Sequence, residues 1–221
     1  MLEFIVLLYF RKRVFILGPS HHVRLSGCAL SATEKYQTPL YDLIIDSHMN
    51  EELYATGKFE TMKIDTDEDE HSIEMQLPYV AKVMERYIQG HFTIIPVLVG
   101  SLSTDKEQTY GRIFAKYLAD PENLFVISSD FCHWGNYDGE YICSTPLRRI
   151  GGILFYPCPF GMDIIETLNP VQFSDYLKQY HNTICGRYPI GVLLNVTTTL
   201  KFLGYDSSSV TTHGRMTIFG V

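Results

Sequence analysis

The chain has 221 residues, a hydrophobic content of 46% and a formal net charge of -7, which is enough apolar material for one domain with a sizeable core. Its lysines and arginines form no dense cluster, so the composition argues against nucleic acid as a partner. Five cysteines without any CxxC pair argue against a disulfide framework and a structural zinc knuckle, and they favour a reducing compartment.

The first ten residues are strongly apolar and are followed by the basic run 11–13. A signal peptide carries its positive charge before the apolar run, and a membrane-spanning helix needs about 20 apolar residues. We therefore expect no membrane span at this end of the chain. The favoured interpretation of residues 1–11 is a buried strand or an atypical start to the domain, with an amphipathic membrane anchor as the alternative.

Apolar periodicity indicates the fold class. Runs rich in β-branched residues predict buried strands at 14–18, 92–100 and 123–130. Helical spacing predicts helices at 71–90, 104–120 and 171–181, and Thr104 is the expected N-cap of the second helix. This alternation indicates an α/β fold with a central, mostly parallel sheet and helices on both faces. Residues 139–161 have no clear period, so we expect an irregular loop or insertion there.

Reactive side chains gather where the predicted strands end, which is where open α/β sheets place their sites. His21 follows the first strand, Asp130 and His133 follow the third, and Cys185 lies after the last predicted helix. Imidazole and thiolate together suit zinc, iron or copper rather than magnesium or calcium. Asp130 could orient the imidazole of His133 as a general base or as a metal's outer shell. The alternative is that each residue is structural, and spacing alone leaves the two interpretations evenly balanced.

The acidic stretch 65–74 offers a second candidate site. It lacks the glycine and the spaced ligands of an EF-hand calcium loop. Acidic residues are favourable at the N-terminus of a helix, so a helix start is the preferred interpretation. A weaker alternative places His71 and Glu74 at the border of the strand-end site.

Seven stretches of the sequence resemble the Memo family, mediators of ErbB-driven cell motility. They are FILGPSHHV (15–23), TPLYDL (38–43), TDEDEHSIEMQLPY (66–79), FTIIPVLVG (92–100), KYLADPENLF (116–125), SSDFCHWG (128–135) and YHNTICGRYPIGVLLN (180–195). The matching regions cover most of residues 12–138 and 162–200. The resemblance implies a single domain over 1–221 with a fold similar to that of class III extradiol dioxygenases.

The resemblance also implies a pocket that binds iron or copper. His21 of GPSH and Cys185 of NTICGR would be metal ligands, and Asp130 and His133 would line the same pocket. The family has a further metal histidine upstream in an APHAGY-like segment, and no such segment precedes residue 14 here. With the atypical stretches 1–11 and 139–161, this leads us to expect that the family's first strand–helix unit is missing.

Family members are described as adaptors that bind a phosphotyrosine peptide of a receptor tyrosine kinase or a cytoskeletal regulator. We therefore expect a Memo-like signalling adaptor with a metal-binding pocket, located in the cytoplasm and also in the nucleus. The alternative is a dioxygenase-like redox enzyme in which His133, oriented by Asp130, is the acid–base group. A variant of that alternative uses Cys185 as a nucleophile. The missing upstream ligand weighs against both enzymes.

Overall fold

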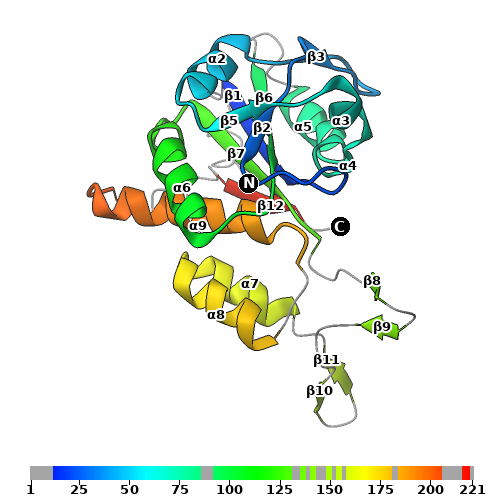
Figure 1. The fold of residues 1–221 in the computed structure, drawn as a ribbon, viewed down its shortest axis with the longest axis vertical. Coiled ribbons are helices and arrows are strands. Elements are labelled where there is room, and N and C mark those ends of the chain that lie inside the picture. The colour runs from blue at the N-terminus through cyan, green and yellow to red at the C-terminus, as the bar shows by residue number, and fades with distance from the viewer. Residues whose placement is uncertain are drawn as a thin grey trace.

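The structure is a computed structural model that describes residues 12–85, 92–130, 135–137, 140–142, 148–150, 153–155, 158–180, 184–205 and 216–219. A six-stranded sheet with the order β12-β7-β1-β6-β2-β5 forms its centre (Figure 1). The strands are β1 (Arg13–Pro19), β2 (Cys28–Leu30), β5 (Phe59–Thr61), β6 (Thr93–Val99), β7 (Asn123–Ser128) and β12 (Met216–Phe219). Only β2 and β6 pair antiparallel, so the predicted, mostly parallel sheet is confirmed.

The three predicted strands form the middle of this sheet as β1, β6 and β7. Successive side chains of a strand point to opposite faces, and both faces of β1 are buried. Phe15 and Leu17 enter one hydrophobic core, whereas Val14 and Ile16 enter a second core on the other side. Burial on both faces explains why these strands read as continuous apolar runs.

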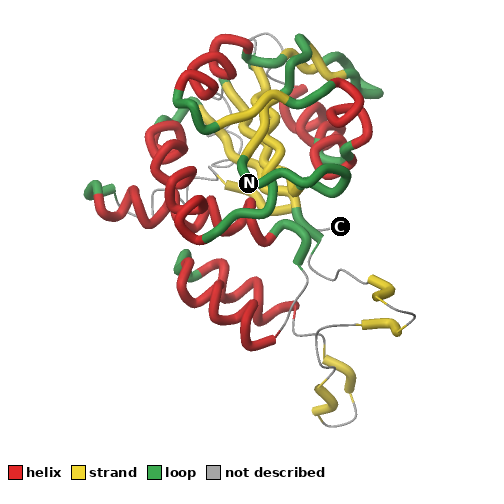
Figure 2. Tube along the Cα trace, in the orientation of Figure 1, coloured by secondary structure: helices red, strands yellow, loops and turns green. Residues whose placement is uncertain are grey.

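Helices cover both faces, as the sequence predicted (Figure 1). Helices α2 (Ser47–Ala55), α6 (Thr104–Ala119) and α9 (Arg187–Phe202) pack on the core that contains Phe15. Helices α4 (His71–Glu74) and α5 (Leu77–Met84) pack on the other core, after α3 (Ile64–Asp69). Helices α7 (Cys158–Glu166) and α8 (Pro170–Tyr180) form a pair beside α9 (Figure 2).

Two details of the predicted helices differ from the structure. The helix expected at 71–90 is divided into α4 and α5, with Pro78 in the first turn of α5, and residues 86–90 lie outside the described residues. The expected N-cap Thr104 is wrong by one position. Ser103 has an extended backbone and its side chain accepts a hydrogen bond from the N–H of Lys106, so it caps α6.

Short strand pairs complete the described structure. They are β3 (Lys35–Tyr36) with β4 (Leu43–Ile44), β8 (Gly135–Tyr137) with β9 (Glu140–Ile142), and β10 (Arg148–Ile150) with β11 (Ile153–Phe155). Part of the segment 139–161, expected to be irregular, therefore contains short strands and the start of α7. Strands of three residues are too short to show a period of two. Within the described ranges, no helix has the length and apolar character needed to cross a membrane. Residues 1–11 lie outside those ranges.

Candidate metal centre

The candidate site lies where β1 ends and α4 begins. A Cβ atom on Gly18 would lie 2.6 Å from Ser72 Oγ and 2.8 Å from Ile73 Cγ1, so only glycine lets α4 approach β1 this closely. Ser72 Oγ also donates a hydrogen bond of 2.8 Å to the carbonyl of Pro19. These contacts place the residues just after β1 beside the first residues of α4.

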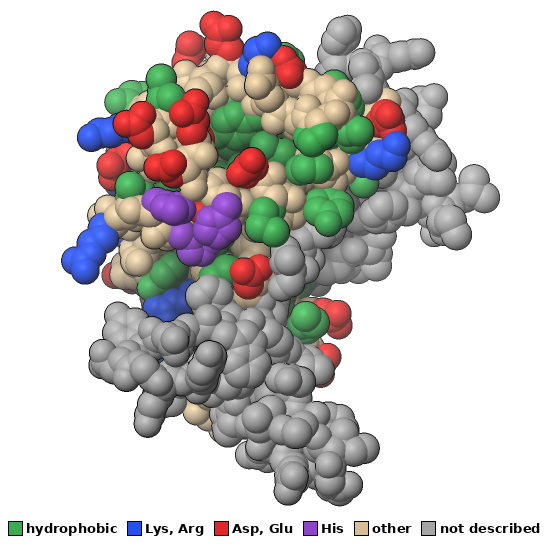
Figure 3. Space-filling view, turned by 90° about the vertical axis from the view of Figure 1, so that its right-hand side faces the viewer, with side chains coloured by type: hydrophobic (Ala, Val, Ile, Leu, Met, Phe, Trp, Pro, Cys, Tyr) green, Lys and Arg blue, Asp and Glu red, His purple; other side chains and the backbone are tan. Residues whose placement is uncertain are grey.

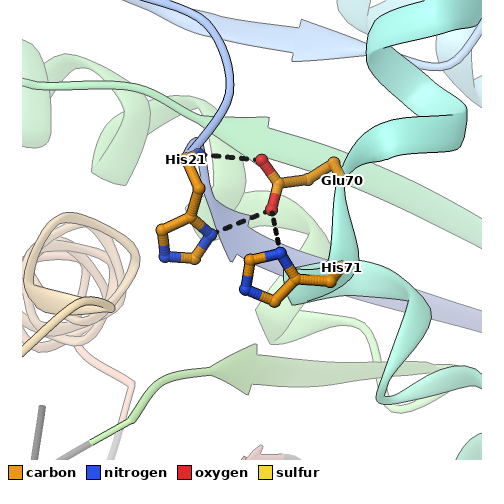
Figure 4. A group of neighbouring side chains, drawn as sticks. All are labelled: His21, Glu70 and His71. Carbon is orange, nitrogen blue, oxygen red and sulfur yellow. Dashed lines mark hydrogen bonds and ion pairs between the residues drawn. The ribbon is translucent and has the colours of Figure 1, made fainter.

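Glu70, which precedes α4, is buried and accepts hydrogen bonds from two sides (Figure 4). The N–H of His21 donates to Oε2 at 2.8 Å, and Nδ1 of His21 lies 2.9 Å from Oε1. The N–H of Ser72 donates to Oε1 at 3.1 Å, which makes Glu70 the N-cap of α4. Burial acts to raise the pKa of Glu70, but the hydrogen bonds from His21 and Ser72 lower it to about 2. Glu70 is therefore an ionised carboxylate that fixes the position of His21.

His21 lies between this carboxylate and the thiol of Cys185. A hydrogen bond to Cys185 and a second to Glu70 raise the pKa of His21 to about 10, although burial acts to lower it. Because Nδ1 faces Glu70, Nε2 is the ring nitrogen that points away from the carboxylate (Figure 4). The structure thus brings together His21 and Cys185, the two residues that the sequence analysis proposed as metal ligands.

The turn before α9 places Cys185 against the end of β7. The N–H of Asp130 donates to Cys185 Sγ at 3.0 Å, and the N–H of Cys185 donates to the Asp130 carbonyl at 3.3 Å. Gly186 allows this approach, because a Cβ atom there would lie 2.3 Å from Ser129 Cβ. Since β1 and β7 are neighbours in the sheet, His21 and Cys185 meet although they are far apart in the sequence.

Asp130 and His133 were expected to line the same pocket. The main chain of Asp130 does contact Cys185. His133 lies outside the described residues, so an acid–base role for His133, oriented by Asp130, stays a prediction.

The acidic stretch contributes more to the site than expected. His21, Glu70 and His71 form a group whose possible ligand atoms all lie within 4.8 Å of one another. His71 therefore borders the site as the weaker alternative predicted, but Glu74 is not in the group and its side chain is exposed. The sequence analysis missed Glu70. Its only signal was its place directly before the helix that starts at His71.

The surface around this group is polar and hollow. Figure 3 shows histidine side chains gathered in one patch, which the ring contacts among His21, His22 and His71 define. A cavity of about 520 Å³ lies beside the patch, and His21, His22, Arg24 and Glu60 are among the residues that line it. The donor atoms are therefore accessible to a small ion or ligand.

Comparisons with known proteins identify relatives of this chain. A model of the family described as "Memo-like protein" matches residues 6–218. Protein MEMO1 from Homo sapiens is 59% identical over 197 residues, which cover 89% of this chain and 66% of the relative. Protein MEMO1 from Danio rerio is 58% identical over 195 residues, 88% of this chain and 65% of the relative.

A worm relative extends the comparison. Protein memo-1 homolog from Caenorhabditis elegans is 52% identical over 213 residues, which cover 90% of this chain and 59% of the relative. The chain thus spans between 59% and 66% of the length of these relatives. With a family match over residues 6–218 and identities above half, the chain belongs to the Memo-like protein family.

Proposed function

We propose that the protein is a metal-binding signalling adaptor in which His21 and Cys185 hold an iron or copper ion. The observation that carries the proposal is the buried carboxylate of Glu70, which orients the imidazole of His21 beside the thiol of Cys185. An imidazole oriented by a carboxylate through Nδ1 is the usual arrangement of a metal-ligating histidine.

The donor atoms fit such an ion. A neutral imidazole nitrogen and a thiolate sulfur are ligands for iron, copper and zinc, whereas magnesium and calcium prefer oxygen. The hydrogen bond from the N–H of Asp130 fixes the position of Sγ at the end of β7. When bound, the ion supplies a positive charge and an open coordination position for a ligand. His21 and Cys185 would hold the ion, and Glu70 would keep the imidazole in the tautomer that offers Nε2.

The adaptor part of the proposal rests on family membership. By resemblance, the partner is a phosphotyrosine peptide of a receptor tyrosine kinase or of a cytoskeletal regulator, through which the protein links receptor signals to cell motility. Its place of action is the cytoplasm, and also the nucleus. Fluorescence anisotropy with a labelled phosphotyrosine peptide tests this part. We expect saturable binding that the unphosphorylated peptide does not reproduce, and equal binding of both peptides would contradict it.

Metal analysis of the purified chain tests the site. We expect one equivalent of iron or copper per chain after reconstitution, and loss of that metal in His21→Ala and in Cys185→Ser. His48→Ala is a matched control, because His48 is exposed on α2, away from the group around Glu70. A folded wild-type chain without stoichiometric metal, or variants that retain it, would overturn the proposal.

A further inference from the structure

The ring of His71 lies flat against the ring of His21. The two centroids are 4.6 Å apart and the ring planes differ by 15°. His71 is 51% exposed, whereas the carboxylate between the two histidines is 2% exposed. The exposed imidazole of His71 therefore lies beside His21, a proposed metal ligand, and next to the buried carboxylate of Glu70.

Both rings face the same oxygen of Glu70. Nδ1 of His21 is 2.9 Å from Oε1 and Nδ1 of His71 is 3.7 Å from it. Because both Nδ1 atoms face the carboxylate and the rings are nearly parallel, both Nε2 atoms point away from it in the same direction (Figure 4). One carboxylate can therefore orient two imidazoles toward the same space, as outer-shell carboxylates do in metal sites.

The rings are close enough to share an ion once His71 turns. Two imidazoles on a tetrahedral ion at about 2.0–2.1 Å each have nitrogens roughly 3.3–3.5 Å apart. The ring centroids are 4.6 Å apart, which is more than 1 Å longer, and the nearly parallel rings direct their lone pairs along nearly parallel lines. The exposed side chain of His71 therefore has to rotate out of the stack for its Nε2 to reach an ion held by His21. His21 need not move, because Glu70 and Cys185 already hold it.

We propose that His71 is a third protein ligand, and that His21, His71 and Cys185 bind one ion while Glu70 orients both imidazoles. This inference rests on the proposed metal site and extends it to a residue of α4. A set of two nitrogens and one sulfur leaves one position of a four-coordinate ion open.

His22 provides a matched control. It is exposed and also contacts His71, but edge-on at 5.9 Å, and it does not belong to the group around Glu70. A histidine that merely adds positive charge or surface area to the patch would behave like His22. A ligand would not.

Cobalt(II), added anaerobically to the metal-free chain of 221 residues, is the probe, because it does not oxidise a thiolate. Binding is measured by titration, and X-ray absorption counts the imidazole ligands. We expect His71→Ala to weaken binding by roughly 10–100-fold and to reduce the imidazole count from two to one. His22→Ala should change neither value, and circular dichroism should show that both variants fold.

The outcomes separate this inference from the proposed function. Unchanged affinity and two imidazoles in His71→Ala would overturn the ligand role of His71 while the site of His21 and Cys185 stands. A wild-type chain that binds no cobalt, or His21→Ala and Cys185→Ser variants that bind like wild type, would overturn both. Should His71→Ala fail to fold, His71→Gln replaces it, with the same expected fold-change and ligand count.

Discussion

Two glutamates in different regions of the molecule, the buried Glu70 and the half-buried Glu107, have pKa values shifted in opposite directions. The hydrogen bonds of His21 and Ser72 outweigh the effect of burial at Glu70, beside β1, and lower its pKa to about 2. At Glu107, in the first turn of α6, burial raises the pKa to about 7, and within the described residues only the charge of Arg187 counteracts this. The surroundings of Glu70 therefore stabilise a negative charge, whereas those of Glu107 do not.

The surroundings explain the difference. Glu70 lies where a strand end and a helix start present free N–H groups, and an imidazole supplies a further donor. Glu107 lies against α9, where a Cβ atom on Gly191 would be 2.7 Å from its carboxyl group, so backbone takes up the space a donor would need. Hydrogen-bond donors, rather than the degree of burial, therefore decide which carboxylate stays ionised.

The largest expected effect is on stability when the buried carboxylate is removed. Glu70→Ala leaves two N–H groups and the His21 imidazole without their acceptor, and we expect it to lower the free energy of unfolding by about 2–3 kcal/mol. The stabilising contribution of ionised Glu70 is complete above its unfolded pKa of 4.5, and that of protonated His21 is complete below its unfolded pKa of 6.5. The loss of stability in Glu70→Ala is therefore largest between these two pH values. Urea unfolding in that pH window checks this, with Glu74→Ala, exposed on α4, as the control.

A smaller effect is expected on metal affinity when only the charge of Glu70 is removed. Glu70→Gln keeps the size of the side chain but replaces the ionised acceptor of the His21 imidazole with a neutral amide. We expect metal to bind roughly 10–100-fold more weakly, as measured by titration with cobalt(II). Glu74→Gln should bind like wild type. Equal affinity of Glu70→Gln and wild type would show that the carboxylate does not act on the ligands.

Metal affinity should also depend on pH. The hydrogen bonds to Cys185 and Glu70 raise the pKa of His21 to about 10, so at neutral pH the imidazole carries a proton that the metal must displace. Affinity should therefore rise with pH toward that value, by about tenfold per pH unit for each proton released. Titrations at several pH values, with proton release followed in weak buffer, measure this slope. An affinity independent of pH would contradict a protonated His21.

The smallest expected effect concerns the second glutamate. Because the pKa of Glu107 is raised on folding, ionised Glu107 lowers the free energy of unfolding, and this loss grows as pH rises from 4.5 through about 7. Glu107→Gln should therefore raise the melting temperature by roughly 1–4 °C above pH 7 and leave it unchanged near the unfolded pKa. Thermal unfolding monitored by circular dichroism checks this. Equal stabilisation at both pH values would mean that ionisation of Glu107 is not the cause.

Much of the sheet could be predicted from the sequence, because burial on both faces gives β1, β6 and β7 unbroken apolar runs. The outer strands β2 and β5 have three residues each and show no such signal. Helix α9 was not predicted, because it is buried along most of its length and lacks the polar face that reveals a helical period.

The candidate site was predictable only in part. His21 and Cys185 follow from the family resemblance, and their meeting follows from the adjacency of β1 and β7. Glu70 was not predictable, because it is 49 positions from His21 in the sequence and its contact depends on how closely α4 packs on Gly18. Local sequence reveals a helix start, but it does not reveal which side chain that start will meet.

The central claim is that His21 and Cys185 bind the same ion, and the ultraviolet spectrum of the cobalt(II)-loaded chain tests it most directly. A cobalt–thiolate bond gives a charge-transfer band that imidazole ligation alone does not produce. We expect this band to saturate at one cobalt per chain, to be absent from Cys185→Ser and to be lost in His21→Ala. A wild-type chain without the band, or one that keeps it after either substitution, would contradict the account.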